Sequence, residues 1–433
     1  MAISKKVLRT KCRQVNHITS TESSVKKFTY IDLFAGAGGL SEGFIREQFE
    51  PVAHVEMSSE AADTLRTRIA FHYWKQKGDL TKYYSYLQQE ISRSELWDSI
   101  PQELLDTVIN EEISENSINR IFLKIDSQLD NQKVDVIIGG PPCQAYSLVG
   151  RSRDPNRMIN DQRNYLFRYY AQFLSRYKPK FFVFENVLGL LTAGNSKYLN
   201  EMFILFKEMG YSADMEVLNA EDYGSLQKRR RVIIIGRRGT KKFIFPDLDL
   251  LENSGEVKRD LFHDLPFLKP GQEIEIAHYT QDTNDYLSKT EIRNGIDYTT
   301  QHITRNHNDR DLEIYSLAID KWLNDRKRLK YNDIPKRLQT HRNTVAFLDR
   351  YKVVDPIGHS HTVVAHISKD GHYYIYPDPK QVRSISVREA ARIQSFPDDF
   401  FFEGGRTAAF KQIGNAVPPL MANALAKTIS NLF

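Results

Sequence analysis

The sequence predicts an α/β protein built on a doubly wound, mostly parallel sheet, with a second, smaller domain. Short apolar runs alternate with longer helical patterns through the first half of the chain, as in parallel sheets covered on both faces. The first apolar run leads directly into a glycine-rich turn, DLFAGAGGL (Asp32–Leu40), that opens a helix. After Pro246 the chain becomes more polar and its periodicity weakens, until helical patterns return from Ser386.

These changes of pattern divide the chain. We expect a flexible N-terminal arm over 1–27, a first domain built from 28–250 and 383–433, and a second domain over 251–382. A helical insertion without a strand is expected over about 75–132. The length of 433 residues suits two domains of ordinary size.

Six apolar runs are expected to form the strands of the first domain: Phe28–Phe34, Pro51–Met57, Asp135–Gly140, Phe181–Val187, Asp214–Leu218 and Val232–Gly236. Four segments with helical spacing are expected to form helices: Ser58–Trp74, Tyr165–Tyr177, Val387–Phe396 and Met421–Leu432. Gly414–Asn415 is expected to form a loop. Pro418 and Pro419 then stand at a helix start, where proline is favoured.

The composition is that of a soluble globular protein. Hydrophobic residues make up 41% of the chain and charged residues 27%, and no apolar run approaches the ~18 residues of a membrane span. The basic N-terminal stretch lacks an apolar segment and is not predicted to be a secretory signal. Two cysteines, Cys12 and Cys143, argue against a disulfide framework and favour a reducing compartment. The net charge of +5 is a mild indication of a polyanionic partner.

A glycine-rich turn between a strand and a helix is typical of nucleotide-binding sites. Glycine allows close backbone approach, and the helix N-terminus offers free N–H donors. Glu56 ends the next strand, at a suitable distance to bind ribose hydroxyls. The turn lacks the GxGxxG pattern, which disfavours a dinucleotide, although a nicotinamide enzyme or a merely structural turn stays open.

The segment IIGGPPCQAYSLVG (Ile137–Gly150) places one of the two cysteines just after a buried strand. Loop residues at the carboxyl end of a parallel strand face the ligand crevice, and Pro141 and Pro142 stiffen the turn. A nucleophilic thiol needs such a partly exposed position. The competing interpretation is that Cys143 is a small buried hydrophobic residue, and its position alone does not decide between the two.

Two further segments place polar groups at strand ends. FFVFENV puts Glu185 and Asn186 at the end of an apolar strand, where a carboxylate is costly without a function or a partner. SLQKRRRVIIIG alternates Gln227, Arg229 and Arg231 into a strand, so that their side chains share one face. The alternative for Glu185 is an acid that caps a helix or forms a salt bridge. The alternative for Gln227, Arg229 and Arg231 is a plain charged strand edge.

Taken together, these segments resemble the DNA cytosine-5 methyltransferase family, of the bacterial restriction–modification type. The shared motifs, in the family's order, are DLFAGAGGL, the strand-end Glu56, GGPPCQAYS, ENV, QKRRR, REAARIQSFP and IGNAVPP. The combination of the Pro-Cys and Glu-Asn-Val motifs is highly specific, and the resemblance covers most of the chain outside the insertion and the variable domain. It implies a Rossmann-like methyltransferase sheet for the first domain and a target-recognition domain over 251–382.

The resemblance implies transfer of a methyl group from S-adenosylmethionine to carbon 5 of a cytosine flipped out of duplex DNA. A soft thiolate adding at carbon 6 activates the ring, and Cys143 matches that nucleophile. Glu185 matches the acid that contacts ring nitrogen 3, and Arg231 matches the arginine on the carbonyl oxygen. The matching residues that complete the catalytic set are Asn186, Arg229 and Gln227. The sequence does not identify the base that removes the carbon-5 proton.

The resemblance also implies a binding site for S-adenosylmethionine. Its residues are Phe34, Gly36, Gly38, Gly39, Glu56, Met57, Pro142, Leu166, Asn415 and Ala416. Met57 departs from the family pattern, which often has an aromatic residue there to stack on adenine, although methionine also packs on rings. The acid that binds the adenine amino group is not identified, because Asp79 and Asp126 are both candidates.

Residues expected to contact DNA lie after the cysteine and in the second domain. They are Gln144, Ser147, Arg151, Arg163 and Thr362. The first four belong to a polar, basic segment similar to the mobile loop that closes over DNA in this family; solvated loop charge is the alternative for its arginines. A basic cluster over 326–337, with Trp322 and Tyr331 interleaved, is either a DNA contact or a charged helix face.

Double-stranded DNA is therefore the expected partner of a monomer that acts in the bacterial cytoplasm, at the nucleoid. A cognate restriction endonuclease acting separately is a further expected partner, and no metal site is expected. Two alternatives stay open: an RNA (tRNA) cytosine-5 methyltransferase, and a catalytically silent DNA-binding regulator. The presence of Cys143, Glu185 and Arg231 disfavours the silent regulator.

Overall fold

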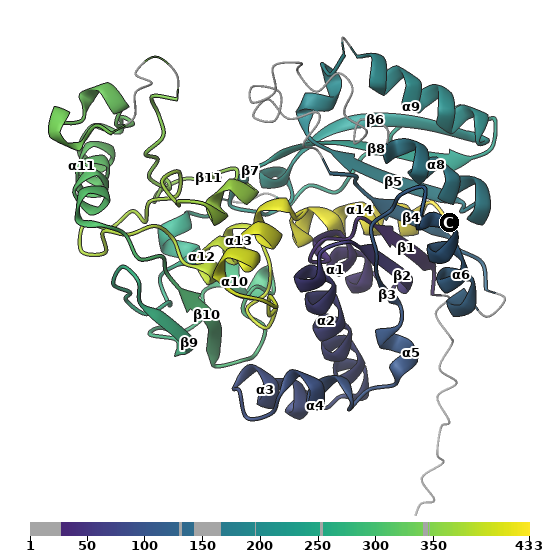
Figure 1. Cartoon of the computed structure of the whole chain (residues 1–433), viewed down its shortest axis with the longest axis horizontal. Helices are drawn as coiled ribbons and strands as arrows, with labels where there is room; N and C mark the ends of the chain where they lie inside the picture. The colour runs from purple at the N-terminus through teal and green to yellow at the C-terminus, as the bar shows by residue number, and fades with distance from the viewer. Residues whose placement is uncertain are drawn as a thin grey trace, which may run out of the picture.

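The computed structural model describes residues 27–129, 132–142, 166–194, 196–251, 254–340, 345 and 347–433. These residues form two lobes, with a large sheet in one and the small sheet of β9 and β10 in the other (Figure 1). None of the helices in these ranges is long and apolar enough to cross a membrane.

The larger lobe contains a seven-stranded sheet in the order β3-β2-β1-β4-β5-β8-β6. Its strands are β1 (Thr29–Leu33), β2 (Glu50–Glu56), β3 (Val108–Asn110), β4 (Val136–Gly139), β5 (Phe181–Asn186), β6 (Tyr211–Asn219) and β8 (Arg230–Arg238). Neighbouring strands from β3 to β5 are parallel, and β8 runs antiparallel to both β5 and β6. The predicted doubly wound, mostly parallel sheet is confirmed, and each of the six predicted strands is present.

Helices cover both faces of this sheet. On one face, α1 (Gly39–Arg46) and α14 (Pro419–Asn431) contribute Phe44 and Met421 to the core. On the other face lie α6 (Ile118–Leu129), α8 (Leu166–Tyr177) and α9 (Lys197–Glu208). Gly43 lets α1 and α14 touch, because a Cβ at this position would lie 2.4 Å from the backbone nitrogen of Asn423. The last helix of the chain therefore completes the first lobe.

The segment 75–132 contains a strand, which corrects the prediction of an insertion without one. After α2 (Ser59–Lys77) come three short helices, α3 (Thr81–Leu87), α4 (Arg93–Trp97) and α5 (Gln102–Leu105). β3 follows and pairs with β2 at the edge of the main sheet. A strand of three residues is too short to show the alternation that marks a strand in a sequence. Tyr83 and Leu96 of the short helices pack with Ile296 and Tyr298 of the smaller lobe, so these helices bridge the two lobes.

The smaller lobe carries β9 (Glu273–His278), β10 (Tyr298–Ile303), α10 (Asp285–Lys289) and α11 (Asp309–Asp325). Its two-residue strand β11 (Ser360–His361) pairs in parallel with β7 (Gln227–Lys228), which directly precedes β8. α12 (Val387–Ile393) and α13 (Arg406–Asn415) then lead back to α14. Gly414–Asn415 ends α13 and is not the predicted loop, because the amide of Ala416 still bonds to the carbonyl of Gln412.

Buried arginines tie distant segments of the chain together in the smaller lobe and at its contact with α2. Arg392, on α12, donates to Asp264 at 2.6 Å and to Asp398 at 2.5 Å, and all three side chains are fully buried. Arg68 reaches across from α2 and donates to Asp399 at 2.9 Å. We call this set of residues the seam. Each of its guanidinium groups is held by carboxylates from other segments of the chain.

Candidate active site

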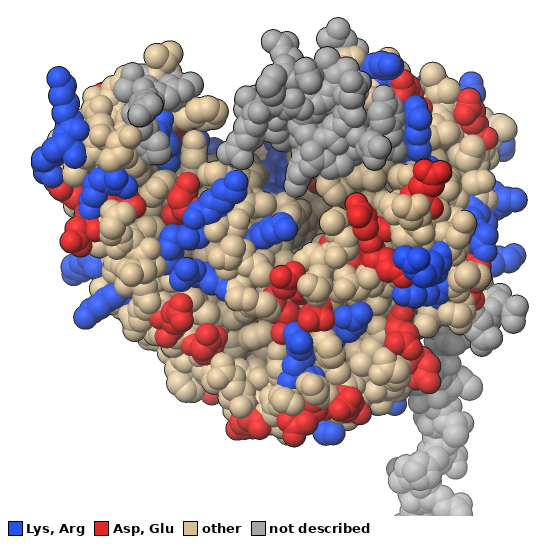
Figure 2. Space-filling model, viewed as in Figure 1, with Lys and Arg blue, Asp and Glu red and all other residues tan. Residues whose placement is uncertain are grey.

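The predicted site residues gather at one edge of the large sheet. This edge holds the carboxyl ends of β1, β2, β4 and β5 and, because β8 is antiparallel, the amino end of β8. The strand order reverses between β1 and β4, and ligands bind outside the carboxyl ends of the strands at such a point. Figure 1 shows this edge turned toward the smaller lobe, and Figure 2 shows a hollow between the lobes.

The glycine turn is fixed by Glu56. One oxygen of its carboxylate accepts from the amide of Gly36 at 2.8 Å, and the other accepts from the amide of Ser58 at 2.7 Å. Phe34 and Gly36 both have positive φ, of 59° and 56°. A phenylalanine in the left-handed region is strained, and such strain concentrates at binding sites. The turn therefore has the conformation and the anchored backbone expected of a ligand cradle.

Two glycines let other segments of the chain pack closely against this turn. A Cβ at Gly38 would lie 2.7 Å from the side chain of Leu65, and a Cβ at Gly39 would lie 2.3 Å from the carbonyl oxygen of Val417. Because Gly39 has no side chain, Ala416 and Val417, which follow Asn415 in the chain, lie beside the first turn of α1. Asn415 is exposed there, whereas Ala416 is buried.

The carboxyl ends of β2 and β3 add exposed groups. Met57 follows Glu56 and is 59% exposed, so its side chain is open to contact by a ligand. Asn110, at the end of β3, donates to the carbonyl of Glu56 at 2.9 Å. Two residues further on, Glu112 is exposed and forms no ion pair within the described ranges.

Neither acid suggested for the adenine amino group is free at this edge. Asp126 is ion-paired with Arg176 of α8, and Asp79 accepts from the amide of Thr81 where α3 begins. Glu112 is a third candidate. The sequence analysis missed Glu112 because it did not predict β3. Glu112 is recognised by its position just after a strand that ends beside Glu56.

The turn that leads to Cys143 begins against Glu185. A Cβ at Gly140 would lie 2.7 Å from Oε2 of Glu185, so only glycine allows this approach. Nδ2 of Asn186 donates to the carbonyl oxygen of Pro141 at 3.2 Å and fixes the direction of the turn. Pro142 and Leu166, the described residues on either side of 143–165, are half-buried. Outside the described residues lie Cys143, Gln144, Ser147, Arg151 and Arg163.

Glu185 and Arg231 form an ion pair at this edge. Nε of Arg231 lies 2.7 Å from Oε1 of Glu185, and the two side chains are 11% and 14% exposed, respectively. They come from the adjacent strands β5 and β8. The pair therefore presents a carboxylate and a guanidinium together, beside the turn that precedes the cysteine.

The alternation predicted for QKRRR is confirmed: Gln227, Arg229 and Arg231 are buried, whereas Lys228 and Arg230 are exposed. The buried side chains have separate partners.

Arg229 ties β8 to the end of the chain. Its guanidinium donates to the carbonyl oxygens of Val363 at 2.5 Å, Gly414 at 3.1 Å and Ala416 at 2.7 Å. Gln227 accepts from the amide of Val363 at 2.7 Å. These two residues join the smaller lobe and the loop beside the glycine turn to the strand that carries Arg231.

Comparison with known proteins agrees with this geometry. A model of the family described as C-5 cytosine-specific DNA methylase matches residues 28–431. The chain belongs to this family. This methylase is 43% identical to the type II methyltransferase M.Bpa9945I of Bacillus paralicheniformis, over 93% of this chain and 98% of that protein. It is 32% identical to the type II methyltransferase M1.HphI of Haemophilus parahaemolyticus, over 93% of this chain and 86% of that protein.

Solved structures support the fold. A DNA modification methyltransferase encoded within an E. coli prophage superposes with a TM-score of 0.60 and 23% identity, over 94% of the methylase and 99% of that chain. The Entamoeba histolytica methyltransferase EhMeth gives a TM-score of 0.51 with 15% identity, over 94% and 99% of the two chains. With the family match, the predicted enzyme class, a DNA (cytosine-5-)-methyltransferase, is confirmed.

Thr362 of the methylase was expected to contact DNA, and the basic cluster over 326–337 was left open as a DNA contact or a charged helix face. The hydroxyl of Thr362, in the smaller lobe, donates to the carbonyl of Lys228 at 2.6 Å, which fixes this threonine at the joint between the lobes. In the basic cluster over 326–337, Arg326 is paired with Asp355 and Arg337 with Glu313. These pairs favour a charged surface for the two arginines, but not the predicted charged helix face, because α11 ends at Asp325, before the cluster.

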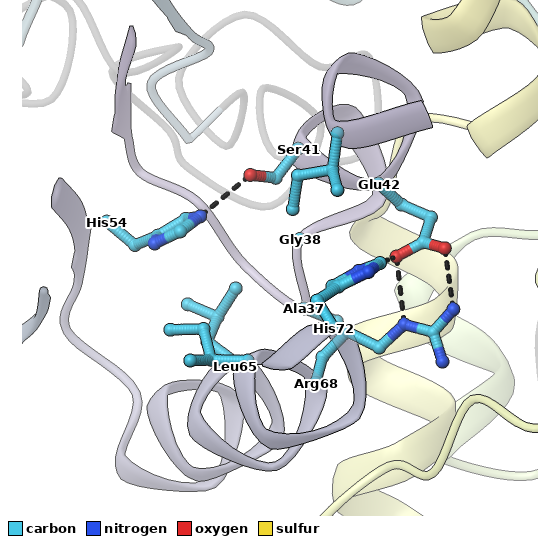
Figure 3. Close-up of a pocket in the computed structure, with 10 residues that line it drawn as sticks. Ala37, Gly38, Ser41, Glu42, His54, Leu65, Arg68 and His72 are labelled. Carbon is cyan, nitrogen blue, oxygen red and sulfur yellow. Dashed lines mark hydrogen bonds and ion pairs between the residues drawn. The ribbon is translucent and has the colours of Figure 1, made fainter. Parts of the chain in front are cut away.

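A cavity lined by both apolar and polar residues, which the sequence analysis missed, lies between α1, β2 and α2 of the methylase, beneath the glycine turn (Figure 3). Oγ of Ser41 lies 2.7 Å from Nε2 of His54, and Glu42 accepts from Arg68 at 2.6 Å. Burial lowers the pKa of His54 to about 3, so this imidazole is neutral at ordinary pH. The neighbouring Asp32 is buried in β1, and burial and the charge of Glu56 raise the pKa of its carboxyl. These partners come from three separate elements, so no local pattern reveals them.

Proposed function

We propose that this methylase transfers the methyl group of S-adenosylmethionine to carbon 5 of a cytosine flipped out of a specific duplex DNA sequence, through a transient covalent adduct with Cys143. The observation that carries the proposal is the Glu185–Arg231 pair, at 2.7 Å, against the turn that leads to Cys143. A carboxyl group and a guanidinium held together match the polar edge of cytosine, which offers a ring nitrogen and a carbonyl oxygen.

The cofactor cradle is proposed at the glycine turn. Phe34, Gly36, Gly38 and Gly39 would surround the methionine part of the cofactor, and Glu56 would accept from the ribose hydroxyls. Its two oxygens each hold one amide, and each keeps a lone pair for a hydroxyl. Met57 would pack on the adenine ring, Glu112 would accept from its amino group, and the pocket would be closed by Pro142, Leu166, Asn415 and Ala416. When bound, S-adenosylmethionine supplies an electrophilic methyl group.

The chemistry of the cytosine ring explains the need for a thiolate. Carbon 5 is a poor nucleophile until the Cys143 sulfur bonds to carbon 6, which makes the ring an enamine. Glu185 would donate a proton or hydrogen bond to ring nitrogen 3, and Arg231 would donate to the carbonyl oxygen, so that both stabilise the added charge. After carbon 5 has gained the methyl group, loss of its proton returns the electron pair and breaks the sulfur–carbon bond. No residue is assigned as the base for that step.

Three further residues would hold this arrangement. Asn186 positions the Pro-Cys turn through the carbonyl of Pro141, and Gln227 and Arg229 fix the strand that carries Arg231. Gln144, Ser147, Arg151, Arg163 and Thr362 are proposed to contact DNA. We further propose that the methylase acts as a monomer and protects the sites of a separate restriction endonuclease, as the type II names of its relatives suggest.

Two measurements test the proposal. Purified protein should transfer label from radioactive S-adenosylmethionine to duplex DNA and not to transfer RNA, and label on transfer RNA alone would contradict the DNA assignment. Bisulfite sequencing of DNA from cells that express the protein should then show the methylated sequence.

The covalent step has its own test. A duplex with 5-fluorocytosine at the target should trap a protein–DNA adduct, because fluorine cannot leave as a proton does. Cys143→Ser should form no adduct, and an adduct that persists in this variant would remove Cys143 as the nucleophile.

A further inference from the structure

Three buried polar side chains that the catalytic scheme does not use meet beneath the glycine turn. They are Tyr30 of β1, Ser41 of α1 and His54 of β2, and each is at most 2% exposed. The hydroxyls of Tyr30 and Ser41 are hydrogen-bonded to each other, and Oγ of Ser41 lies 2.7 Å from Nε2 of His54 (Figure 3). We call these three residues the support cluster. Burial of polar groups costs free energy unless they are hydrogen-bonded, so the cluster is stable only while these contacts hold.

Each member of the support cluster stands close in the chain to a residue of the proposed cofactor cradle. The member on β1 precedes Phe34 by four positions, and the member on β2 precedes Glu56 by two. The member on α1 follows Gly39, the first residue of that helix, by two positions. The cluster therefore joins the three elements that supply the cradle, at the level where they enter it.

The other bonds of the glycine turn tie it to one strand. Glu56 accepts from the amide of Gly36 at 2.8 Å, and the amide of Ala35 donates to the carbonyl of Val55 at 3.1 Å. Both acceptors belong to β2. The left-handed conformation of Phe34 persists only where the surroundings hold it. The support cluster adds the link from α1 to both strands.

The ionisation of the support cluster favours a positioning role over acid–base chemistry. Burial lowers the pKa of His54 to about 3 and raises the pKa of the Tyr30 hydroxyl well above its ordinary value. The cluster is therefore uncharged at ordinary pH. It neither takes up nor releases a proton there, and its hydrogen bonds keep the same form across that range.

We propose that Tyr30, Ser41 and His54 position the glycine turn for S-adenosylmethionine, although none of them contacts the cofactor. This inference rests on the proposed function. The contacts of the cluster fix the start of α1 against the ends of β1 and β2, so the turn and Glu56 are held in place before the cofactor arrives. A site that is already ordered binds its ligand more tightly, because less freedom is lost on binding.

The test measures the affinity for the cofactor directly. The full-length protein is titrated with S-adenosylmethionine by calorimetry, and methylation is followed at saturating cofactor and DNA. Ser41→Ala leaves Tyr30 and His54 at 3.5 Å from each other, too far for a good hydrogen bond. The Kd for S-adenosylmethionine should rise by about 10-fold, which equals about 1.4 kcal/mol and is typical of one unpaired buried polar group. The rate at saturation should stay near the parental value.

Two substitutions of His54 separate positioning from packing. The amide nitrogen of glutamine takes a place close to that of Nε2 and can still hydrogen-bond to Ser41, whereas asparagine is one methylene shorter. His54→Gln should therefore keep a Kd near the parental value, and His54→Asn should raise it as Ser41→Ala does. Equal Kd values for the two variants would overturn the role of the hydrogen bond.

Tyr211→Phe is the matched control for Tyr30→Phe. Both remove one buried hydroxyl, but that of Tyr211 donates to the carbonyl of Pro179 at 2.9 Å, on the edge strand at the opposite side of the sheet from β2. Tyr30→Phe should raise the Kd for S-adenosylmethionine severalfold, and Tyr211→Phe should leave it unchanged. A lower melting temperature with a parental Kd in Tyr30→Phe and Ser41→Ala, or an equal rise of Kd in Tyr211→Phe, would overturn the positioning role. Failure of the parental protein to bind S-adenosylmethionine would overturn the proposed function itself.

Discussion

Arginine–carboxylate pairs occur both at the seam and at the candidate active site, and they differ in what surrounds them. At the seam, Arg392 contacts two carboxylates and all three side chains are fully buried. At the site, Arg231 contacts Glu185 and both keep some exposure, beside a turn that leads to a cysteine. An arginine–carboxylate pair that is fully buried contributes to the stability of the fold. The same kind of pair, when it is partly exposed, can still contact a ligand.

The largest effect is expected from breaking the seam. Arg392→Leu leaves Asp264 and Asp398 buried without their cation, and removal of one partner of a buried ion pair costs about 3–5 kcal/mol. Guanidinium unfolding should show this loss in the free energy of unfolding. A free energy within about 1 kcal/mol of the parent would show that the seam is not needed for stability.

A substitution in the partly exposed Glu185–Arg231 pair is expected to lower the rate of methylation and to leave the stability of the fold unchanged. Glu185→Gln keeps a hydrogen-bond acceptor for Arg231 but cannot donate a proton in the same way, so methylation should slow by about 100-fold or more. DNA binding and the melting temperature should stay near the parental values. Turnover at the parental rate would make Glu185 a structural residue and remove the contrast with the seam.

A neutral histidine next to the seam gives a pH-dependent test. His302 lies 3.0 Å from Ser386 and 2.9 Å from the carbonyl of Pro266, and burial lowers its pKa to about 4. The unfolded chain takes up this proton near its ordinary pKa of about 6.5, so folding becomes less favourable as the pH falls from about 6.5 toward 4. His302→Gln should therefore remove on the order of 1 kcal/mol of the stability difference between pH 7 and pH 5. An identical pH dependence in parent and variant would contradict this assignment.

The smallest effect is expected at the surface pair Arg337–Glu313. Both groups are exposed to solvent, where screening and side-chain entropy offset the attraction. Arg337→Gln should leave the denaturation midpoint unchanged, and DNA affinity should also stay the same if the charged-surface interpretation is correct. If the Arg337→Gln variant bound DNA more weakly but kept the parental stability, Arg337 would be a DNA contact.

Much of the fold could be predicted because the sheet depends on local patterns. The apolar runs of β1, β4 and β5 and the alternation of Gln227, Arg229 and Arg231 are visible in the sequence. β3 was missed because three residues carry too little pattern, and Gly414–Asn415 was misassigned because glycine at the end of a helix resembles a loop.

The partners of buried polar groups could not be predicted. The bonds of Arg229 to Val363 and Ala416 join residues more than 130 positions apart. Such contacts depend on the packing of the whole chain, and neither periodicity nor spacing contains them. For the same reason the sequence identified Glu185 and Arg231 as candidates but could not show that they touch.

The packing of α14 against α1 through Gly43 has a consequence for the order of folding. These two helices are more than 370 positions apart in the sequence, yet they pack on the same side of the large sheet with Phe44 and Val183. Closing so long a stretch of chain costs entropy before the contacts form, so we expect this side of the sheet to be completed late in folding.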